Sequence, residues 1–77
     1  MSQATLIQSI VDYLLRKKAE GKKLVFRTAI YAVMEDRHGT AAIADGRAIT
    51  YRLLNDAAQL AGGSYVPAKN GNSKVVF

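Results

Sequence analysis

Apolar residues recur every three or four positions in several stretches of the chain, which is the spacing of one helical face. The most regular stretch is residues 45–61, whose apolar positions are Ile49, Leu53, Ala57 and Leu60. We expect Asp45 to cap this helix and Gly62 with Gly63 to end it. Its opposite face carries side chains that donate to phosphates or base edges: Arg47, Thr50, Tyr51, Arg52 and Asn55. This pattern suits a recognition helix, although it is more often an ordinary core helix with a solvated polar face.

A second helix is predicted over residues 2–19, with Ser2 as its N-cap and Gly21 just beyond its end. Its apolar stripe is wide and consists of Leu6, Ile7, Ile10, Val11, Leu14 and Leu15. Such a stripe is typical of a helix that packs on a core.

A third helix is predicted over residues 28–38, capped by Thr28 and followed by Gly39 in the left-handed position. Ile30, Val33 and Met34 share one side of it. Residues 40–44 either form a separate turn or open the helix at 45–61. We favour a break near Asp45, because an opening at 40 would place Gly46 inside the helix at a cost of about 1 kcal/mol.

Two stretches predict β-structure. Residues 24–26 are rich in β-formers but too short to be stable alone, so this strand needs a partner. Asn70-Gly71 predicts a two-residue type I′ hairpin turn, which would place Val66 opposite Val75 and Tyr65 opposite Val76. Polar groups gather at the tip of this hairpin: Lys69, Asn70, Asn72 and Lys74.

Composition narrows the class of protein. A chain of 77 residues with 49% hydrophobic content predicts a single folded domain over residues 1–77. There is no cysteine, which excludes a disulfide framework and is consistent with a cytoplasmic location. No apolar run resembles a signal peptide or approaches the roughly 18 residues of a membrane span, so we expect no membrane partner.

The charge is high for so small a domain. The net charge is +5, and six of the eleven basic residues fall within residues 16–27. This favours a polyanionic partner, most often nucleic acid. A lysine-rich solvated loop explains the cluster equally well.

The candidate chemistry is sparse, and we expect neither an enzyme nor a cofactor. The only histidine, His38, stands where it can bond the last carbonyls of its helix. With no cysteine and one histidine, a zinc site has too few ligands. The adjacent acids Glu35 and Asp36 diverge by about 100° on a helix, and no glycine-rich phosphate-binding motif occurs.

The order helix, short strand, helix, helix, hairpin resembles the winged helix-turn-helix family over nearly the whole chain. The resemblance implies an α+β fold in which the third helix enters the major groove of DNA and the hairpin, or wing, touches the backbone or minor groove. It also implies that the short strand pairs with the base of the wing. The chain departs from the family pattern at Glu35, where a small residue is common, and in its long connection at 39–45.

The favoured hypothesis is therefore a small regulator, or an architectural or recombination factor, that binds duplex DNA as a monomer or dimer. The major groove would be faced by Arg47, Thr50, Tyr51, Arg52 and Asn55, which would read base edges. The four polar residues of the hairpin tip would meet phosphates or the minor groove. Further backbone contacts would come from Lys22, Lys23, Arg27 and Thr28. The alternatives are a protein-interaction module, such as an inhibitor or adaptor, and a single-strand binder using Tyr51 and Tyr65.

Overall fold

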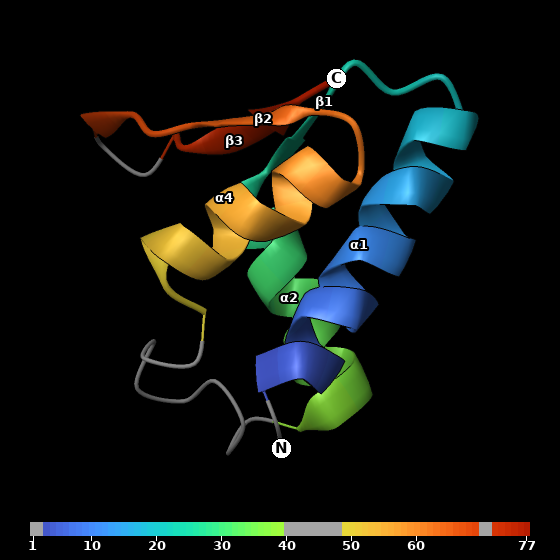
Figure 1. The fold of residues 1–77 in the computed structure, drawn as a ribbon, viewed down its shortest axis with the longest axis vertical. Coiled ribbons are helices and arrows are strands. Elements are labelled where there is room, and N and C mark those ends of the chain that lie inside the picture. The colour runs from blue at the N-terminus through green and yellow to red at the C-terminus, as the bar shows by residue number, and fades with distance from the viewer. Residues whose placement is uncertain (1–2, 40–48, 70–71) are drawn as a thin grey trace.

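The computed structural model describes residues 3–39, 49–69 and 72–77 (Figure 1). The described elements are three helices and three short strands: α1 (Gln3–Ala19), β1 (Leu24–Phe26), α2 (Arg27–His38), α4 (Tyr51–Leu60), β2 (Ser64–Val66) and β3 (Lys74–Val76). The strands form one antiparallel sheet, and the helices lie on one side of it. The predicted α+β class is confirmed. No helix in the described residues is long and apolar enough to cross a membrane.

The sheet has the order β1-β3-β2, so β1 obtains the partner that its length requires. Val25 pairs with Val75, and Tyr65 pairs with Val75 from the other side. All three side chains are buried against the helices. The predicted strand at 24–26 and its pairing with the base of the hairpin are confirmed.

The predicted hairpin register is wrong by one residue. Val66 pairs with Lys74, and Tyr65 pairs with Val75. Side chains alternate between the faces of a strand, so only this register places Tyr65 and Val75 side by side in the core. The seven residues 67–73 connect the strands, and Asn70-Gly71 lies outside the described residues.

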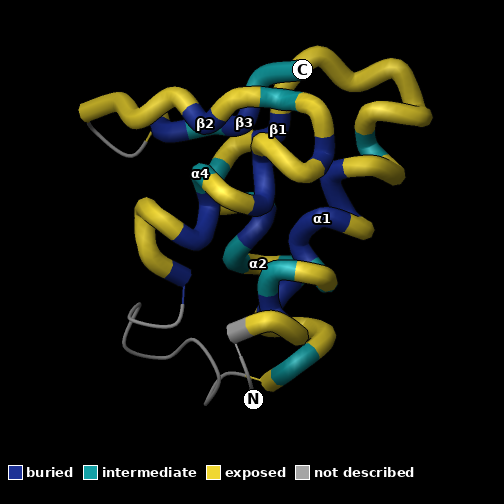
Figure 2. The backbone as a smooth tube through the Cα atoms, in the orientation of Figure 1, coloured by how far each residue is buried: buried dark blue, intermediate teal, exposed yellow. Residues whose placement is uncertain are grey.

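The core lies between α1, α2, α4 and the inner face of the sheet (Figure 2). Its largest fully buried side chains are Ile10, Leu14, Ile30, Met34, Ile49, Leu53, Leu54 and Val75. Most predicted apolar positions are confirmed, but Leu15 is 46% exposed and Leu60 is 68% exposed. These two residues lie at the margins of their helical stripes, where the neighbouring elements do not cover them.

The prediction of one helix over 45–61 is wrong at its start. Thr50 has an extended backbone (φ −89°, ψ 166°), and its hydroxyl accepts a hydrogen bond from the Leu53 amide at 3.2 Å. Thr50 is thus the N-cap, and the helix begins at Tyr51. The predicted cap Asp45 lies outside the described residues, as do Gly46 and the ambiguous stretch 40–44.

The start of α2 also differs from the prediction. Phe26 occupies the cap position without a side-chain bond, and Thr28 lies within the first turn. The strand runs directly into the helix, because the Arg27 amide bonds the Ser73 carbonyl at 2.9 Å and continues the ladder. At the other end, Gly39 has the predicted positive φ of 85°, but its ψ of 156° is not left-handed helical. The predicted cap Ser2 of α1 is not among the described residues.

Two glycines, Gly62 and Gly63, allow the chain to turn directly from α4 into β2. Gly62 has a φ of 82°, which disfavours any residue with a side chain. A Cβ atom on Gly63 would lie 2.6 Å from the Val76 carbonyl oxygen, so the chain passes too close to β3 for a side chain. This close approach places β2 beside β3 directly after the helix.

Candidate nucleic-acid interface

The exposed face of α4 is held outward by the burial of its other face. Leu53, Leu54, Ala57 and Ala58 are at most 1% exposed, and the helix packs on α1 and β2. This leaves an exposed set made of Tyr51, Arg52, Asp56, Gln59 and Leu60, with Asn55 half-buried. The predicted contact residues Tyr51, Arg52 and Asn55 therefore reach the surface of one helix.

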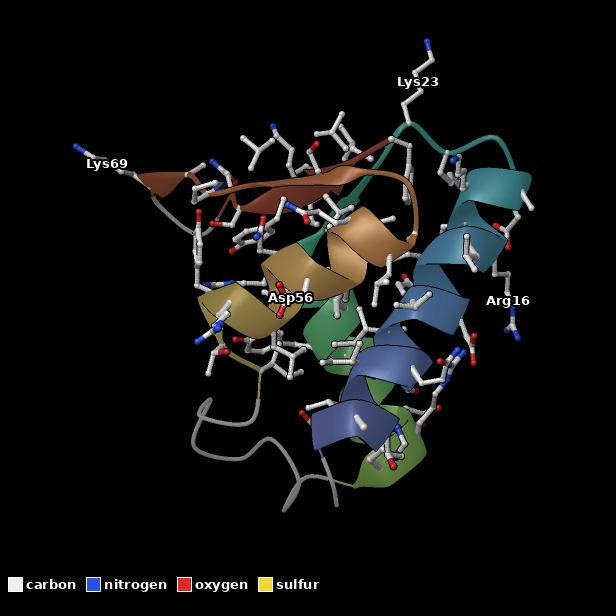
Figure 3. The ribbon with its side chains drawn as sticks, viewed as in Figure 1. Arg16, Lys23, Asp56 and Lys69 are labelled. Carbon is white, nitrogen blue, oxygen red and sulfur yellow. The ribbon has the colours of Figure 1, made fainter. Side chains whose placement is uncertain are left out.

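Asp56 is a surface feature that the sequence-based proposal did not use. It lies one turn after Arg52, and Figure 3 shows its carboxylate on the outer side of α4. Residues 51–60 therefore carry one cation and one anion, and α4 itself contributes no net positive charge. A carboxylate repels phosphates but accepts hydrogen bonds from a cytosine amino group. The charge of α4 thus suits contact with base edges better than contact with the DNA backbone.

A series of contacts joins the start of α2 to the start of α4. The Arg27 guanidinium lies 5.5 Å from the centre of the Tyr31 ring, and the Tyr31 hydroxyl donates to the Ile49 carbonyl at 2.9 Å. On the other side, the Tyr51 and Tyr65 rings meet edge to face with centroids 5.2 Å apart. Thr50 was predicted to contact DNA, but its hydroxyl caps α4 by accepting a hydrogen bond from the Leu53 amide. Tyr31 links Arg27 at the start of α2 to Ile49, the residue before the N-cap of α4.

Residues 67–73 are called the wing, and its described residues 67–69 and 72–73 adjoin the start of α2, because the Arg27 amide bonds the Ser73 carbonyl. Ser73 is 5% exposed, and its hydroxyl both accepts from the Ala68 amide (3.0 Å) and donates to the Ala68 carbonyl (3.2 Å). These bonds hold the two sides of the wing together at its base. Lys69 and Asn72 are exposed beyond them, and Figure 3 shows Lys69 pointing away from the body of the protein.

Lys74 does not lie at the tip of the wing as predicted. It belongs to β3 and pairs with both Phe26 and Val66. Its ammonium group lies 5.8 Å from the centre of the Phe26 ring, on the outer face of the sheet. The shorter strand pairing leaves Lys74 inside the sheet, so this charge is separated from Lys69.

The basic cluster of residues 16–27 is divided by the fold. The Lys23 carbonyl bonds the Phe77 amide at 3.0 Å, whereas the Arg27 amide bonds Ser73. Lys22 and Lys23 therefore stand at the end of the sheet opposite the wing, and only Arg27 and Thr28 stand at the wing end. Figure 3 shows Lys23 and Arg16 pointing away from the side where Lys69 lies. Arg47 and Asn70, both predicted contact residues, lie outside the described residues.

One side-chain group was missed by the sequence analysis. The His38 Nε2 and Ser9 Oγ atoms are 3.0 Å apart, and Arg37 donates to the Ser9 carbonyl and hydroxyl at 3.3 Å. His38 thus meets a neighbouring helix instead of serving its own last carbonyls as expected. The nearby Asp12 carboxylate accepts from the Gln8 amide at 2.9 Å. Ser9 and His38 are 29 residues apart, so only the packing of α1 on α2 brings them together.

The described residues contain no group of three or more histidine, aspartate or glutamate side chains that could hold a metal ion. Searches with the chain against protein-family models, curated proteins and solved structures find no match.

Proposed function

We propose that the protein binds duplex DNA as a winged-helix domain, with the exposed face of α4 in the major groove and the wing on the backbone or in the minor groove. The observation that carries this proposal is the placement of two elements. The N-terminal end of α4 and the wing lie on the same side of the molecule, although about twenty residues separate them in sequence (Figure 1). One duplex could therefore meet both.

The order and pairing of the elements support the same proposal. A helix, a short strand and two further described helical segments precede a hairpin, and β1 pairs with the base of that hairpin. This is the pairing that a winged helix requires. Small size, a net charge of +5 and a pI near 9.8 agree with a polyanionic partner.

The charges suggest a division of roles. Backbone contacts would come from the cations at the wing end, Arg27 and Lys69, together with Arg52 at the start of α4. Base contacts would come from the uncharged donors and acceptors along α4, Asn55 and Gln59, and from Asp56. In this proposal the affinity depends on the wing end and the selectivity on α4. No side chain is assigned a catalytic role.

The test is duplex binding measured by fluorescence anisotropy across a range of salt concentrations. Lys69→Ala should reduce the slope of log affinity against log salt by about 0.9, because one phosphate contact is lost. Lys23→Ala is the matched control. It removes the same exposed charge from the opposite end of the sheet and should leave the slope unchanged.

Two results would contradict the proposal. One is the absence of duplex binding by the parent protein at low salt. The other is an equal loss of slope in the Lys69 and Lys23 variants, which would show that net charge alone drives association.

A further inference from the structure

The outer face of the sheet is a second candidate surface, separate from the proposed DNA interface. Because Val25, Tyr65 and Val75 point inward, the alternate residues of each strand point away from the helices. They form two rows across the sheet: Leu24, Val76 and Ser64, then Phe26, Lys74 and Val66. Figure 1 shows the three helices on the other side of the sheet.

Four of these six side chains are apolar, and they are incompletely covered. Leu24 is 38% exposed, Phe26 is 43% exposed and Val66 is 40% exposed, whereas Val76 is half-buried. Leu24 pairs with Val76 and shares the outer side of β1 with Phe26, so these three residues form one apolar cluster, and Val66 lies across Lys74 from Phe26. Exposed apolar side chains that gather on one face of a sheet differ from apolar residues scattered singly, which need no explanation.

The charged side chains of the strands and of the residues next to them are all lysine or arginine. Lys74 stands at the centre of its row, with its ammonium group beside the Phe26 ring. Lys22 and Lys23 adjoin one end of the sheet, and Lys69 lies beyond the other. Residues 22–27, 64–69 and 72–77 contain no aspartate or glutamate. The charge complement of this face is therefore a partner that carries carboxylates.

We propose that the outer face of the sheet docks an amphipathic helix of a partner protein, with an apolar stripe flanked by aspartate and glutamate. The apolar stripe would cover Leu24, Phe26, Val66 and Val76, and a carboxylate would pair with Lys74. A helix packed there would complete a third layer on a sheet that has helices on one face only. This binding does not depend on DNA binding, since it uses the opposite face of the sheet from α4.

A second copy of this chain is a poorer occupant. The three strands span only about 10 Å across the sheet, which is close to the diameter of one helix, about 10 Å. Stacking two such faces would also bring two Lys74 ammonium groups out of water without a carboxylate between them.

Single-stranded nucleic acid is also less well matched. Such ligands are bound by successive bases stacked on open aromatic rings. Phe26 is the only aromatic residue in the two rows, and the Lys74 ammonium group already lies over its ring. The face therefore provides apolar area and charge but few stacking sites.

The test uses the full chain and a synthetic amphipathic peptide of about 18 residues, long enough to form a helix. The probe carries leucine at helical spacing with glutamate on both sides of the stripe. We expect binding at 150 mM salt, with backbone amide NMR shifts concentrated in β1, β2 and β3. A peptide with lysine in place of glutamate should bind at least about tenfold more weakly, since the sheet face is positive.

Phe26→Ser should weaken binding of the glutamate peptide by about tenfold, because the one aromatic contact on this face is lost. Leu15→Ser is the matched control, since Leu15 is equally exposed but lies on α1. It should leave the affinity unchanged. Melting curves of both variants must match the parent, and Val66→Ser replaces Phe26→Ser if the latter melts early.

Four outcomes would overturn the proposal. They are no binding of the glutamate peptide, equal binding of the lysine peptide, tighter binding of single-stranded oligothymidine at the same strands, and a concentration-dependent dimer in sedimentation that Phe26→Ser abolishes. The last two would assign the face to nucleic acid or to a second copy. Loss of duplex DNA binding would test only the proposed function and leave this result intact.

Discussion

At the scale of single residues, Thr50 decides where the exposed face of α4 begins. Its extended backbone and its bond to the Leu53 amide stop the helix from continuing toward residue 45. Tyr51 then becomes the first helical residue, and its ring contacts Tyr65. One hydroxyl therefore sets which polar side chains stand in the first turn.

Thr50→Ala should lower the free energy of unfolding by about 1 kcal/mol, because the Leu53 amide loses its acceptor. Urea denaturation measures this change. Thr28→Ala is the control, because Thr28 is exposed in the first turn of α2 and caps nothing. Equal losses in both variants would contradict the capping role of Thr50.

Leu53→Ala should lower the free energy of unfolding by about 2–5 kcal/mol, since Leu53 is 1% exposed and a cavity would remain. Thermal melting of the variant should show a large loss or an unfolded chain. Leu60→Ala makes the same change on the same helix at a residue that is 68% exposed, and should cost less than about 0.5 kcal/mol. A parent-like melting curve for Leu53→Ala would show that the buried face has been assigned wrongly.

At the scale of elements, the base of the wing depends on one buried side chain. Ser73 bonds both polar groups of the Ala68 backbone, while its own carbonyl accepts from the Arg27 amide. Ser73 thus links the wing to the junction of β1 and α2. The wing and the start of α2 are held together by these bonds.

Ser73→Ala should lower the free energy of unfolding by about 1–2 kcal/mol, because the Ala68 amide and carbonyl lose their partner. Hydrogen exchange at the Ala68 amide should become faster than in the parent protein. Ser64→Ala is the control, since Ser64 is exposed on β2. Unchanged exchange at Ala68 would mean that the serine does not hold the wing.

At the scale of the whole molecule, the fold divides the positive charge between two places. Arg27, Arg52 and Lys69 stand toward the wing end, and Lys22 and Lys23 stand at the opposite end of the sheet. A uniformly charged surface would bind any polyanion in many orientations. If the proposed function holds, this division would favour one orientation of bound DNA and would leave the outer face of the sheet for the proposed protein partner.

Asn55→Ala should reduce affinity for the preferred DNA site by about 1–3 kcal/mol, with a smaller loss on scrambled duplexes, if α4 reads bases. The preferred site is first selected from a random duplex library. Arg16→Ala is the control, because Arg16 points away from the wing side and should change neither affinity (Figure 3). Equal losses on both duplexes would remove Asn55 from base recognition.

Local sequence patterns alone were enough to predict much of the secondary structure of this protein. The helical periods of α1 and α2, the strand at 24–26 and the glycines after each helix are readable without a structure. Each depends on residues within a few positions of one another, where spacing and backbone preference govern the outcome. For the same reason Leu53 was predicted to be buried, and the structure confirms this. Ile49 is also buried as predicted, but it lies before the cap Thr50 and outside the helix.

Tertiary structure alone decided the register, the start of α4 and the distribution of charge. The turn rule at Asn70-Gly71 gave a register that would have separated Tyr65 from Val75, and burial of that pair prevailed. Lys74 lies on the sheet because of this register, and Lys22 and Lys23 lie at its far end because β1 pairs antiparallel with β3. The contact of Ser9 with His38 likewise depends on the packing of two helices. These features arise from contacts between residues far apart in the chain, where the gain from burying side chains outweighs local preference.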